Sequence, residues 1–149
     1  MLLKLMMSPG GMKLDRFLVR WAGYSPLSVL FAKANNYPNP RQPMLLVAKG
    51  RKSGRKRATV LPWFEIDGRF LVVGSNGGAA TEPQWVSNLR ADPNATLYVA
   101  RKPRTVKARF ATGEERTALW DKLVVTVPIY AQYQTMTTRE IPLVILEPA

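Results

Sequence analysis

The stretch Ala58–Ser75, ATVLPWFEIDGRFLVVGS, decides the fold of this chain. Apolar and β-branched residues fill Ala58–Ile66 and Arg69–Ser75, two runs of strand length on either side of Asp67-Gly68. An Asp-Gly pair between such runs is the strongest short signal for a β-hairpin, because both residues accept the positive φ angles of a tight turn. We therefore predict an antiparallel strand pair at the centre of the chain.

Other strand-like runs lie on both sides of this hairpin. One precedes it, and two later runs are close enough to form a second hairpin that turns at Arg101-Lys102-Pro103. A last apolar run near the C-terminus predicts a further strand. These runs are Met44–Ala48, Ala95–Ala100, Arg104–Thr112 and Ile141–Leu146.

Two helices are expected between the strands. One is predicted to begin near Thr81 and to carry Trp85 on its apolar face. The other is predicted to begin at Thr112, where Glu115 would complete a capping box. Strands and helices do not alternate as they do in a doubly wound α/β fold. The order predicts an α+β fold with about six strands in a small, mostly antiparallel barrel.

Residues 1–43 are expected to form a basic helical arm, and residues 44–149 a strand-rich body. Apolar side chains recur at helical spacing, which predicts an amphipathic helix that stops at Gly23. Ser25-Pro26 predicts the start of a second helix, and segment 35–43 predicts a linker. Two interpretations of the arm stay open: it packs on the body, or it rests on a membrane surface. The apolar positions are Leu14, Phe17, Leu18 and Trp21, and the cations opposite them are Lys13, Arg16 and Arg20.

The composition excludes several kinds of chemistry. The chain has no cysteine and no histidine, which excludes thiolate catalysis, disulfides and histidine-based acids, bases and metal ligands. A bound cofactor is therefore the expected carrier of any reaction. The net charge of +12 favours anionic partners. Because no window approaches the roughly 20 apolar residues of a membrane span, we expect a cytoplasmic protein, and the inner face of the cell membrane is where the arm would rest.

A basic loop is the most distinctive segment. Lys49–Arg57, KGRKSGRKR, carries six cations and two glycines between two predicted strands. Such a loop can present backbone N–H groups, a serine hydroxyl and several cations to one polyanion. Three interpretations stay open for this loop: a solvated hairpin tip, a nucleic-acid contact, and a cradle for the phosphate of a cofactor.

Two further segments could carry chemistry. Gly74–Gly78 follows a strand directly and precedes a helix, so a ligand could approach its backbone closely; a plain turn is the alternative. Tyr130 and Tyr133 lie three residues apart, which places both on one side of a helical turn. Their hydroxyls could donate to a substrate oxygen; the alternative is two tyrosines with packed rings and hydrated tips.

In combination, these segments resemble the deazaflavin-dependent nitroreductase family, split β-barrel proteins that bind coenzyme F420. The likeness covers residues 44–148. It rests on the following residues: Gly50-Arg51-Lys52-Ser53-Gly54, Asp67-Gly68, Ser75, Gly77-Gly78, Pro83, Trp85, Asn88-Leu89, Asn94, Thr112-Gly113-Glu114-Glu115-Arg116, Trp120, Tyr130, Tyr133 and Thr138-Arg139-Glu140-Ile141-Pro142.

The resemblance implies a split β-barrel enzyme that transfers a hydride from reduced F420 to a quinone, an activated alkene or a nitroaromatic compound. The chain departs from the family pattern at Asn76, where many members carry lysine, and at Glu82, where a histidine is frequent. The residues implied in cofactor binding are Arg51, Lys52, Ser53, Gly54, Arg57, Ser75, Asn76, Gly77, Gly78, Trp85 and Asn88. The residues implied in catalysis are Tyr133, Tyr130 and Ser75, and no metal is expected.

Two other functions stay open. A nucleic-acid-binding module would place exposed aromatic rings beside cations, and Tyr98 beside Arg101 is the one such site in the sequence. A carrier would bind F420 without catalysis. The expected partners are the deazaflavin cofactor and a small hydrophobic acceptor, without nucleic acid; membrane contact through the arm and a homodimer are left open.

Overall fold

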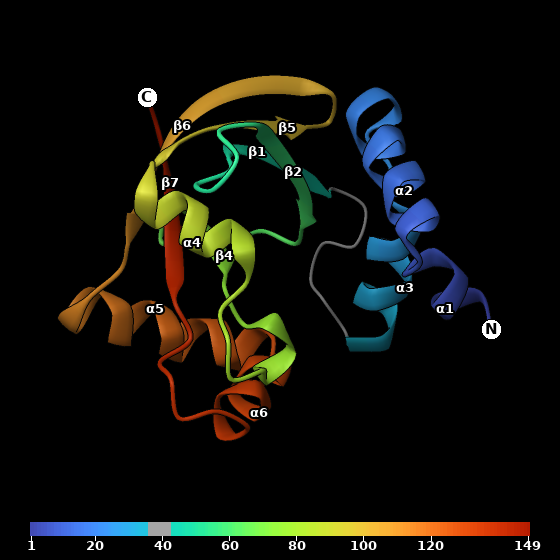
Figure 1. The fold of residues 1–149 in the computed structure, drawn as a ribbon. Coiled ribbons are helices and arrows are strands. Elements are labelled where there is room, and N and C mark those ends of the chain that lie inside the picture. The colour runs from blue at the N-terminus through green and yellow to red at the C-terminus, as the bar shows by residue number, and fades with distance from the viewer. Residues whose placement is uncertain (36–42) are drawn as a thin grey trace.

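The computed structural model describes residues 1–35 and 43–149. Over these residues, the strands are β1 (Met44–Lys49), β2 (Lys56–Leu61), β3 (Phe64–Ile66), β4 (Arg69–Val73), β5 (Asn94–Val99), β6 (Lys102–Phe110) and β7 (Leu143–Pro148). The helices are α1 (Leu2–Met6), α2 (Pro9–Ala22), α3 (Pro26–Asn35), the short 3₁₀ helix η1 (Asn76–Gly78), α4 (Gln84–Ala91), α5 (Gly113–Thr126) and α6 (Ile129–Thr135). The strands form one antiparallel sheet in the order β2-β1-β5-β6-β7-β4-β3 (Figure 1).

The sheet curls into a split barrel, as the sequence predicts. The run Ala58–Ile66, however, is two strands and not one, because Pro62 has no N–H to continue a ladder. The resulting strands, β2 and β3, form the opposite edges of the sheet. Only Pro62 and Trp63 connect these edges. Three Cα–Cα steps span at most about 11 Å, so the sheet must bend until its edges nearly meet.

Both predicted hairpins are present, one of them with a shifted turn. Asp67 and Gly68 adopt φ angles of 53° and 73°, the geometry expected for a tight turn between β3 and β4. The β5–β6 turn lies at Ala100 and Arg101 (φ 49° and 67°), earlier than the predicted Arg101–Pro103 turn. Pro103 is tolerated inside β6 because β7 pairs with β6 only from Val106 onward.

The core has two parts that share β7. Val144 and Leu146 face the barrel interior, where they join the buried side of α4. Leu143 and Ile145 face the other way and pack under α5 and α6. Successive residues of a strand point to opposite faces, which explains why this strand is apolar without interruption.

One predicted helix start and one predicted capping box need correction. Helix α4 begins at Gln84, three residues after the predicted Thr81, because Pro83 holds the extended N-cap position. Thr112 is the N-cap of α5, but no capping box forms there. The carboxylate of Glu115 pairs instead with Arg69 and Arg109 across the sheet.

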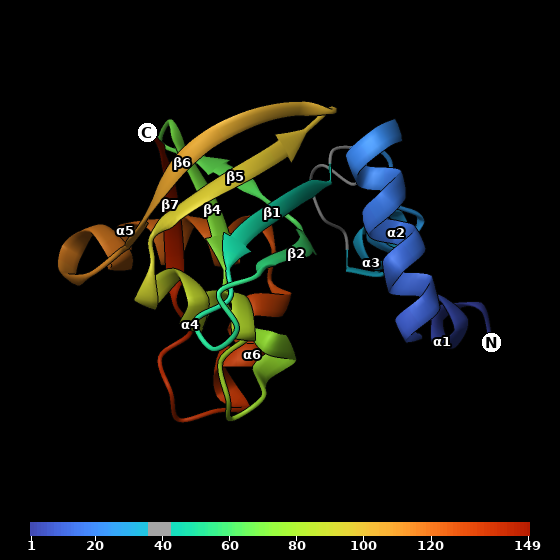
Figure 2. The ribbon, with the colours of Figure 1, turned by 45° about the horizontal axis from the view of Figure 1, so that its top comes forward.

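The arm lies beside the half-barrel on its β1–β2 side in both ribbon views (Figures 1 and 2). Helix α2 ends at Gly23 in the left-handed conformation, and the Ser25 hydroxyl accepts from Ser28 N at 2.8 Å at the start of α3. Both boundaries match the sequence prediction. The linker predicted at residues 35–43 falls mainly on residues 36–42, outside the described residues.

The packing of α2 corrects the sequence interpretation. Val19 and Asp15 are buried, whereas the predicted apolar face points outward, with Trp21 61% exposed and Leu14 and Phe17 similarly open. The predicted polar face packs on the barrel: the Arg20 guanidinium lies 4.2 Å from the Tyr98 ring centroid. Among the described residues, no helix combines the length and apolar character needed to cross a membrane.

Candidate functional site

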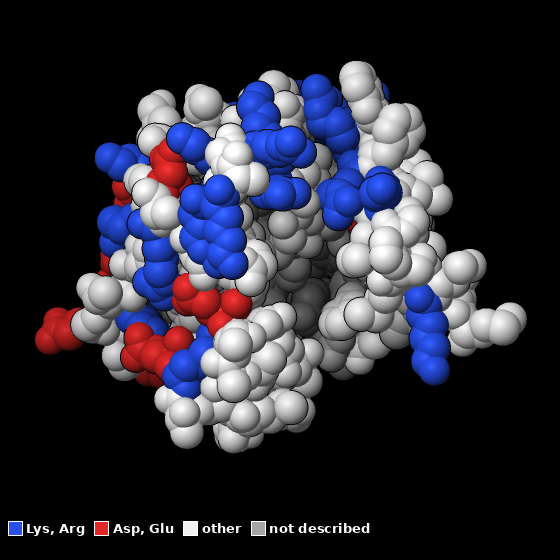
Figure 3. Space-filling model, in the orientation of Figure 1, with Lys and Arg blue, Asp and Glu red and all other residues white. Residues whose placement is uncertain are grey.

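A groove between the arm and the half-barrel contains two adjoining cavities, of about 620 and 770 Å³. Thr59, Gln84 and Trp85 line both cavities, so the groove is continuous. Figure 3 shows this hollow, with lysine and arginine side chains gathered on both sides of its upper end. The smaller cavity is strongly basic and the larger one is mainly apolar, so the groove suits a ligand with an anionic end and an apolar end.

The basic cavity takes its charge mainly from the predicted loop between β1 and β2. None of the described residues that line it is acidic. The absence of a nearby carboxylate leaves these cations available to an anionic ligand. Its cations are Arg51, Lys52, Lys56 and Arg57 of the loop and the start of β2, together with Arg16 of the arm.

Hydrogen bonds hold this loop in one shape. Gly50 N donates to Arg55 O, and Gly54 N donates to Gly50 O, both at 2.8 Å. The buried Asn88 of α4 accepts from Arg51 through Oδ1, at 3.1 Å from the backbone N and 2.9 Å from Nη1. Asn88, which the resemblance implies in cofactor binding, lines the basic cavity, ties the loop to α4 and orients the Arg51 side chain.

The apolar cavity has one wall from the arm and one from the body. Helix α3 contributes Leu27 and Phe31. Opposite them, Tyr130 and Tyr133 line the cavity from α6. The tyrosine rings are 6.1 Å apart, so the i, i+3 spacing places them on one side of the helix as predicted. Tyr130 is only 2% exposed and packs edge-on against Phe64 at 5.8 Å, whereas Tyr133 is half-buried and reachable from the cavity.

The glycine-rich turn after β4 belongs to the apolar end of the groove. Ser75, Asn76 and Gly77 line the apolar cavity. Gly78 adopts φ 82°, and a Cβ there would lie 2.9 Å from Tyr133 O, so a side chain would push the turn away from α6. Asn76 Nδ2 donates to Thr81 O at 2.9 Å, which closes the turn on itself.

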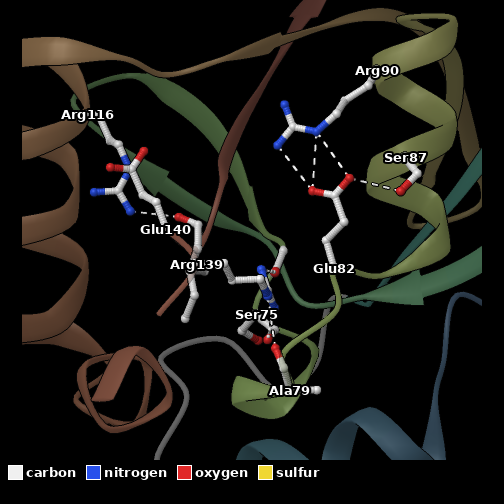
Figure 4. Close-up of polar contacts among 10 residues, drawn as sticks. Ser75, Ala79, Glu82, Ser87, Arg90, Arg116, Arg139 and Glu140 are labelled. Carbon is white, nitrogen blue, oxygen red and sulfur yellow. Dashed lines mark hydrogen bonds and ion pairs between the residues drawn. The ribbon is translucent and has the colours of Figure 1, made fainter. Parts of the chain in front are cut away.

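Arg139 holds this turn in place, a role that sequence reasoning missed. Its guanidinium donates to three carbonyl oxygens, those of Gly74 (3.1 Å), Ser75 (2.7 Å) and Ala79 (2.9 Å). Figure 4 shows the side chain reaching from the segment before β7 into the turn. The only sequence signal was its place in the Thr138–Pro142 motif. A planar fork with several fixed donors is suited to organising several acceptors at once.

We expect Arg139→Met to lower the free energy of unfolding by about 1.5–3 kcal/mol, because the carbonyls of the turn lose charged donors. Urea denaturation measures the change. Arg139→Lys should recover little of the loss, since an ammonium group cannot replace the fork. The matched control is Arg104→Met, which removes an exposed arginine on β6 and should leave the midpoint unchanged. Equal midpoints for the Arg139 and Arg104 variants would contradict the role assigned to Arg139.

Glu82 lies at the rim of the apolar cavity and remains ionised at neutral pH. Burial by itself raises the pKa of Glu82. The hydrogen bonds from Arg90 and Ser87, together with the charges of Arg90 and Arg139, outweigh this effect, so the pKa lies below its ordinary value. The Glu82 carboxylate accepts from Arg90 Nε at 3.2 Å and from Ser87 Oγ at 2.9 Å (Figure 4). An ionised carboxylate is a poor proton donor. The hydroxyls of Ser75, Tyr130 and Tyr133 are better candidates for donating a proton in this cavity.

The structure therefore gathers the predicted site residues along one groove. The loop residues, with Trp85 and Asn88, lie at its basic end, and Ser75 with the two tyrosines lies at its apolar end. Among the described residues, Gly54 and Gly78 shape the two turns but line neither cavity. Sequence reasoning did not anticipate the contribution of the arm to both cavities.

Comparisons with known proteins agree with this architecture. A Mycobacterium tuberculosis protein assigned as an F420H(2)-dependent quinone reductase is 32% identical over 112 residues, which cover 75% of this chain and 94% of the relative. A solved structure described as an F420-H2 dependent reductase is 38% identical with a TM-score of 0.62 and covers 70% of this chain and 93% of its own. Another solved structure, described as a domain-swapped dimer, is 38% identical with a TM-score of 0.63 and covers 70% of this chain and 79% of its own. The sequence profile of the F420H(2)-dependent quinone reductase family matches residues 33–148, and this chain belongs to that family of oxidoreductases.

Proposed function

We propose that this protein binds reduced coenzyme F420 in the groove and transfers its hydride to a quinone. One observation carries the proposal: a continuous groove is basic at one end and apolar at the other. Coenzyme F420 has the matching chemistry, with an anionic phosphate and glutamate tail joined to a planar deazaflavin ring. The position of the loop favours a phosphate cradle over a solvated hairpin tip.

The basic end would hold the phosphate and the tail. Arg51, Lys52 and Arg57 supply charged donors, and Ser53 supplies a hydroxyl whose oxygen accepts from Arg57 Nη2 at 3.3 Å. Charge-assisted bonds of this kind are about twice as strong as neutral ones. The ring would then lie beside the turn at Ser75–Gly78, with Trp85 at the junction of the two cavities.

Residues of the apolar end would handle the acceptor. The bound cofactor supplies the hydride. The Tyr133 hydroxyl, reachable from the cavity, donates a hydrogen bond or a proton to the acceptor oxygen that gains charge, and Ser75 is the second donor nearby. The walls from α3 and α6 orient the acceptor and exclude water. Quinones suit this cavity because they are planar, apolar and reducible at oxygen; activated alkenes and nitroaromatics are further acceptors that we expect.

The test is a titration followed by turnover. Purified protein should bind F420, and with the reduced form and a soluble quinone it should restore the visible absorbance of the oxidised cofactor. Binding without turnover for any acceptor would instead identify a carrier. Competition of F420 by short nucleic acids would favour a nucleic-acid module, although Tyr98, the aromatic ring expected for it, is half-buried beneath Arg20.

We also propose that the arm rests on the surface of an anionic membrane. Its outward face is apolar, and residues 1–43 carry a net charge of +5. Each cation near an anionic surface adds about 1 kcal/mol of attraction. This contact would bring the apolar cavity, which Phe31 of the arm helps to line, close to lipid-dissolved quinones.

Vesicle co-sedimentation tests the membrane proposal. The parent should bind anionic vesicles at low salt, and Phe17→Ser with Trp21→Ser should reduce binding about tenfold or more, because each exposed aromatic side chain loses its apolar contact. The control Val125→Ser changes an 81% exposed apolar residue outside the arm and should behave as the parent. No difference between parent and double variant would contradict the proposal, and concentration-dependent dimers lost in the double variant would assign this face to a second copy.

A further inference from the structure

We propose that Arg16 of the arm is part of the site for the anionic tail, so that the arm and the basic loop close on the tail from opposite sides. This inference rests on the proposed function and adds a residue outside the predicted loop. Arg16 lines the basic cavity together with Arg51, Lys52 and Arg57. It is the one arm residue among the described lining residues of that cavity.

The position of Arg16 follows from the packing of α2. Val19 and Arg20 come three and four residues later on the same face of the helix. Val19 is buried, and Arg20 lies over the Tyr98 ring of β5. Helix α2 also packs on β1 and β2, and Arg16 lines the basic cavity together with residues of β2 and of the loop. The polar face of α2, which covers the barrel, therefore also contributes to the wall of the cavity.

A buried carboxylate joins the two helices of the arm. Asp15 is 1% exposed, and its two oxygens accept from Ser25 Oγ, each at 2.8 Å. Its Oδ1 also accepts from Leu27 N at 3.2 Å, where α3 begins. Both carboxylate oxygens of Asp15 are therefore used in hydrogen bonds that join α2 with the start of α3. The residue next to it in the chain, Arg16, keeps its charge available to the cavity.

Arg16 has no carboxylate partner among the described residues, as is also true of the loop cations that line the same cavity. Several cations elsewhere find carboxylates, as Arg90 does with Glu82 and Arg109 with Glu115. Among the described residues, no carboxylate forms an ion pair with Arg16, which is half-buried and faces other cations across one cavity. Cations that line one cavity repel one another less when an anion lies between them. The chemistry that fits is a phosphodiester or a chain of carboxylates.

One consequence concerns the acceptor site. The arm supplies Arg16 to the basic cavity and Leu27 and Phe31 to the apolar cavity, and Asp15 joins the two helices that carry them. An anionic tail that bridges Arg16 and the loop would hold the arm against the barrel. Binding of the tail therefore stabilises one wall of the acceptor cavity, which makes cofactor binding favour acceptor binding.

Affinity measurements with three ligands test the inference: full F420, the same molecule without its glutamates, and the deazaflavin ring with its ribityl chain but no phosphate. Arg16→Ala should weaken full F420 about 5–20-fold, the scale of one charged contact that is partly open to water. It should leave the ligand without phosphate unchanged. Arg16→Lys should recover part of the loss, and Lys13→Ala, an exposed cation of the same helix, should change affinity less than twofold. The ligand without glutamates tells whether Arg16 contacts the phosphate or the tail.

Hydrogen exchange gives an independent readout. F420 should slow amide exchange over residues 9–22 in the parent and in Lys13→Ala, and should do so much less in Arg16→Ala. Parent-like affinity and protection in Arg16→Ala, in a protein whose loop variants lose affinity, would overturn the inference and leave the proposed function intact. Equal weakening of all three ligands would also overturn it, because the effect would then be structural. Failure of the parent to bind F420 would overturn the proposed function itself.

Discussion

The double variant Arg51→Ala with Lys52→Ala should bind F420 about 2–4 kcal/mol more weakly than the parent, since charge-assisted hydrogen bonds contribute roughly 1.5–3 kcal/mol each and are not additive. At about 1.4 kcal/mol for each tenfold change, this is a loss of roughly 30–1000-fold. Fluorescence or absorbance titration of the cofactor measures it. Affinity of the parent should also fall as salt rises, because the contacts are ionic.

The matched control removes the same charge elsewhere. Lys102→Ala with Arg104→Ala changes two exposed cations on β6 that line neither cavity. That variant should retain affinity within about twofold at physiological salt, because charges beyond about 8 Å are screened. Equal losses in the two double variants would mean that net charge, and not the loop, governs binding. Unchanged affinity in the loop variant would place the cofactor elsewhere.

The second large effect concerns Tyr133. Tyr133→Phe should lower the rate of quinone reduction about 10–100-fold, at or below the low end of the range for a positioned acid, because water can partly replace the hydroxyl. Cofactor affinity should stay nearly unchanged, since the ring remains and the basic end is untouched. Single-turnover oxidation of the reduced cofactor by a quinone, at saturating cofactor, separates the two quantities.

Tyr130→Phe is the internal comparison. Tyr130 is almost fully buried and packs its ring against Phe64 and Tyr133, so its contribution is mainly to packing. We expect a smaller change in rate than for Tyr133→Phe. A parent-like rate for Tyr133→Phe would return Tyr133 to a packing role, and a larger effect at Tyr130 would reverse the assignment of the two hydroxyls.

Local signals in the sequence were sufficient for the β3–β4 turn and for the boundary between the two longer arm helices. Asp67-Gly68 forms the predicted hairpin, and Gly23 and Ser25 end and begin helices where expected. These signals work because they depend on the dihedral angles and hydrogen bonds of only a few neighbouring residues. The same locality explains the errors. Thr81 carries a local helix-start signal, but Pro83 takes the N-cap position of α4. Glu115 carries a capping-box signal, but its carboxylate pairs with Arg69 and Arg109 of the sheet.

The face of α2 that packs on the barrel could not be predicted from the pattern of a short segment. The spacing of Leu14, Phe17 and Trp21 correctly predicts an amphipathic helix, but periodicity does not tell which face meets the barrel. In the structure the polar face is covered, since Asp15 joins the two arm helices and Arg20 stacks on Tyr98. Burial of those polar groups is tolerated because each has a partner, which the sequence does not display.

Alternation, charge and i, i+3 spacing predict most of the half-barrel strands, the basic loop and the paired tyrosines, because these patterns are properties of short segments. The tertiary structure shows that the loop and the tyrosines lie at opposite ends of one groove, that the arm forms part of its wall, and that Arg139 holds the turn beside the tyrosines. The physical reason is that these relations join residues far apart in the chain. Such contacts depend on how the curled sheet brings its edges, helices and loops together, and no short segment carries that information.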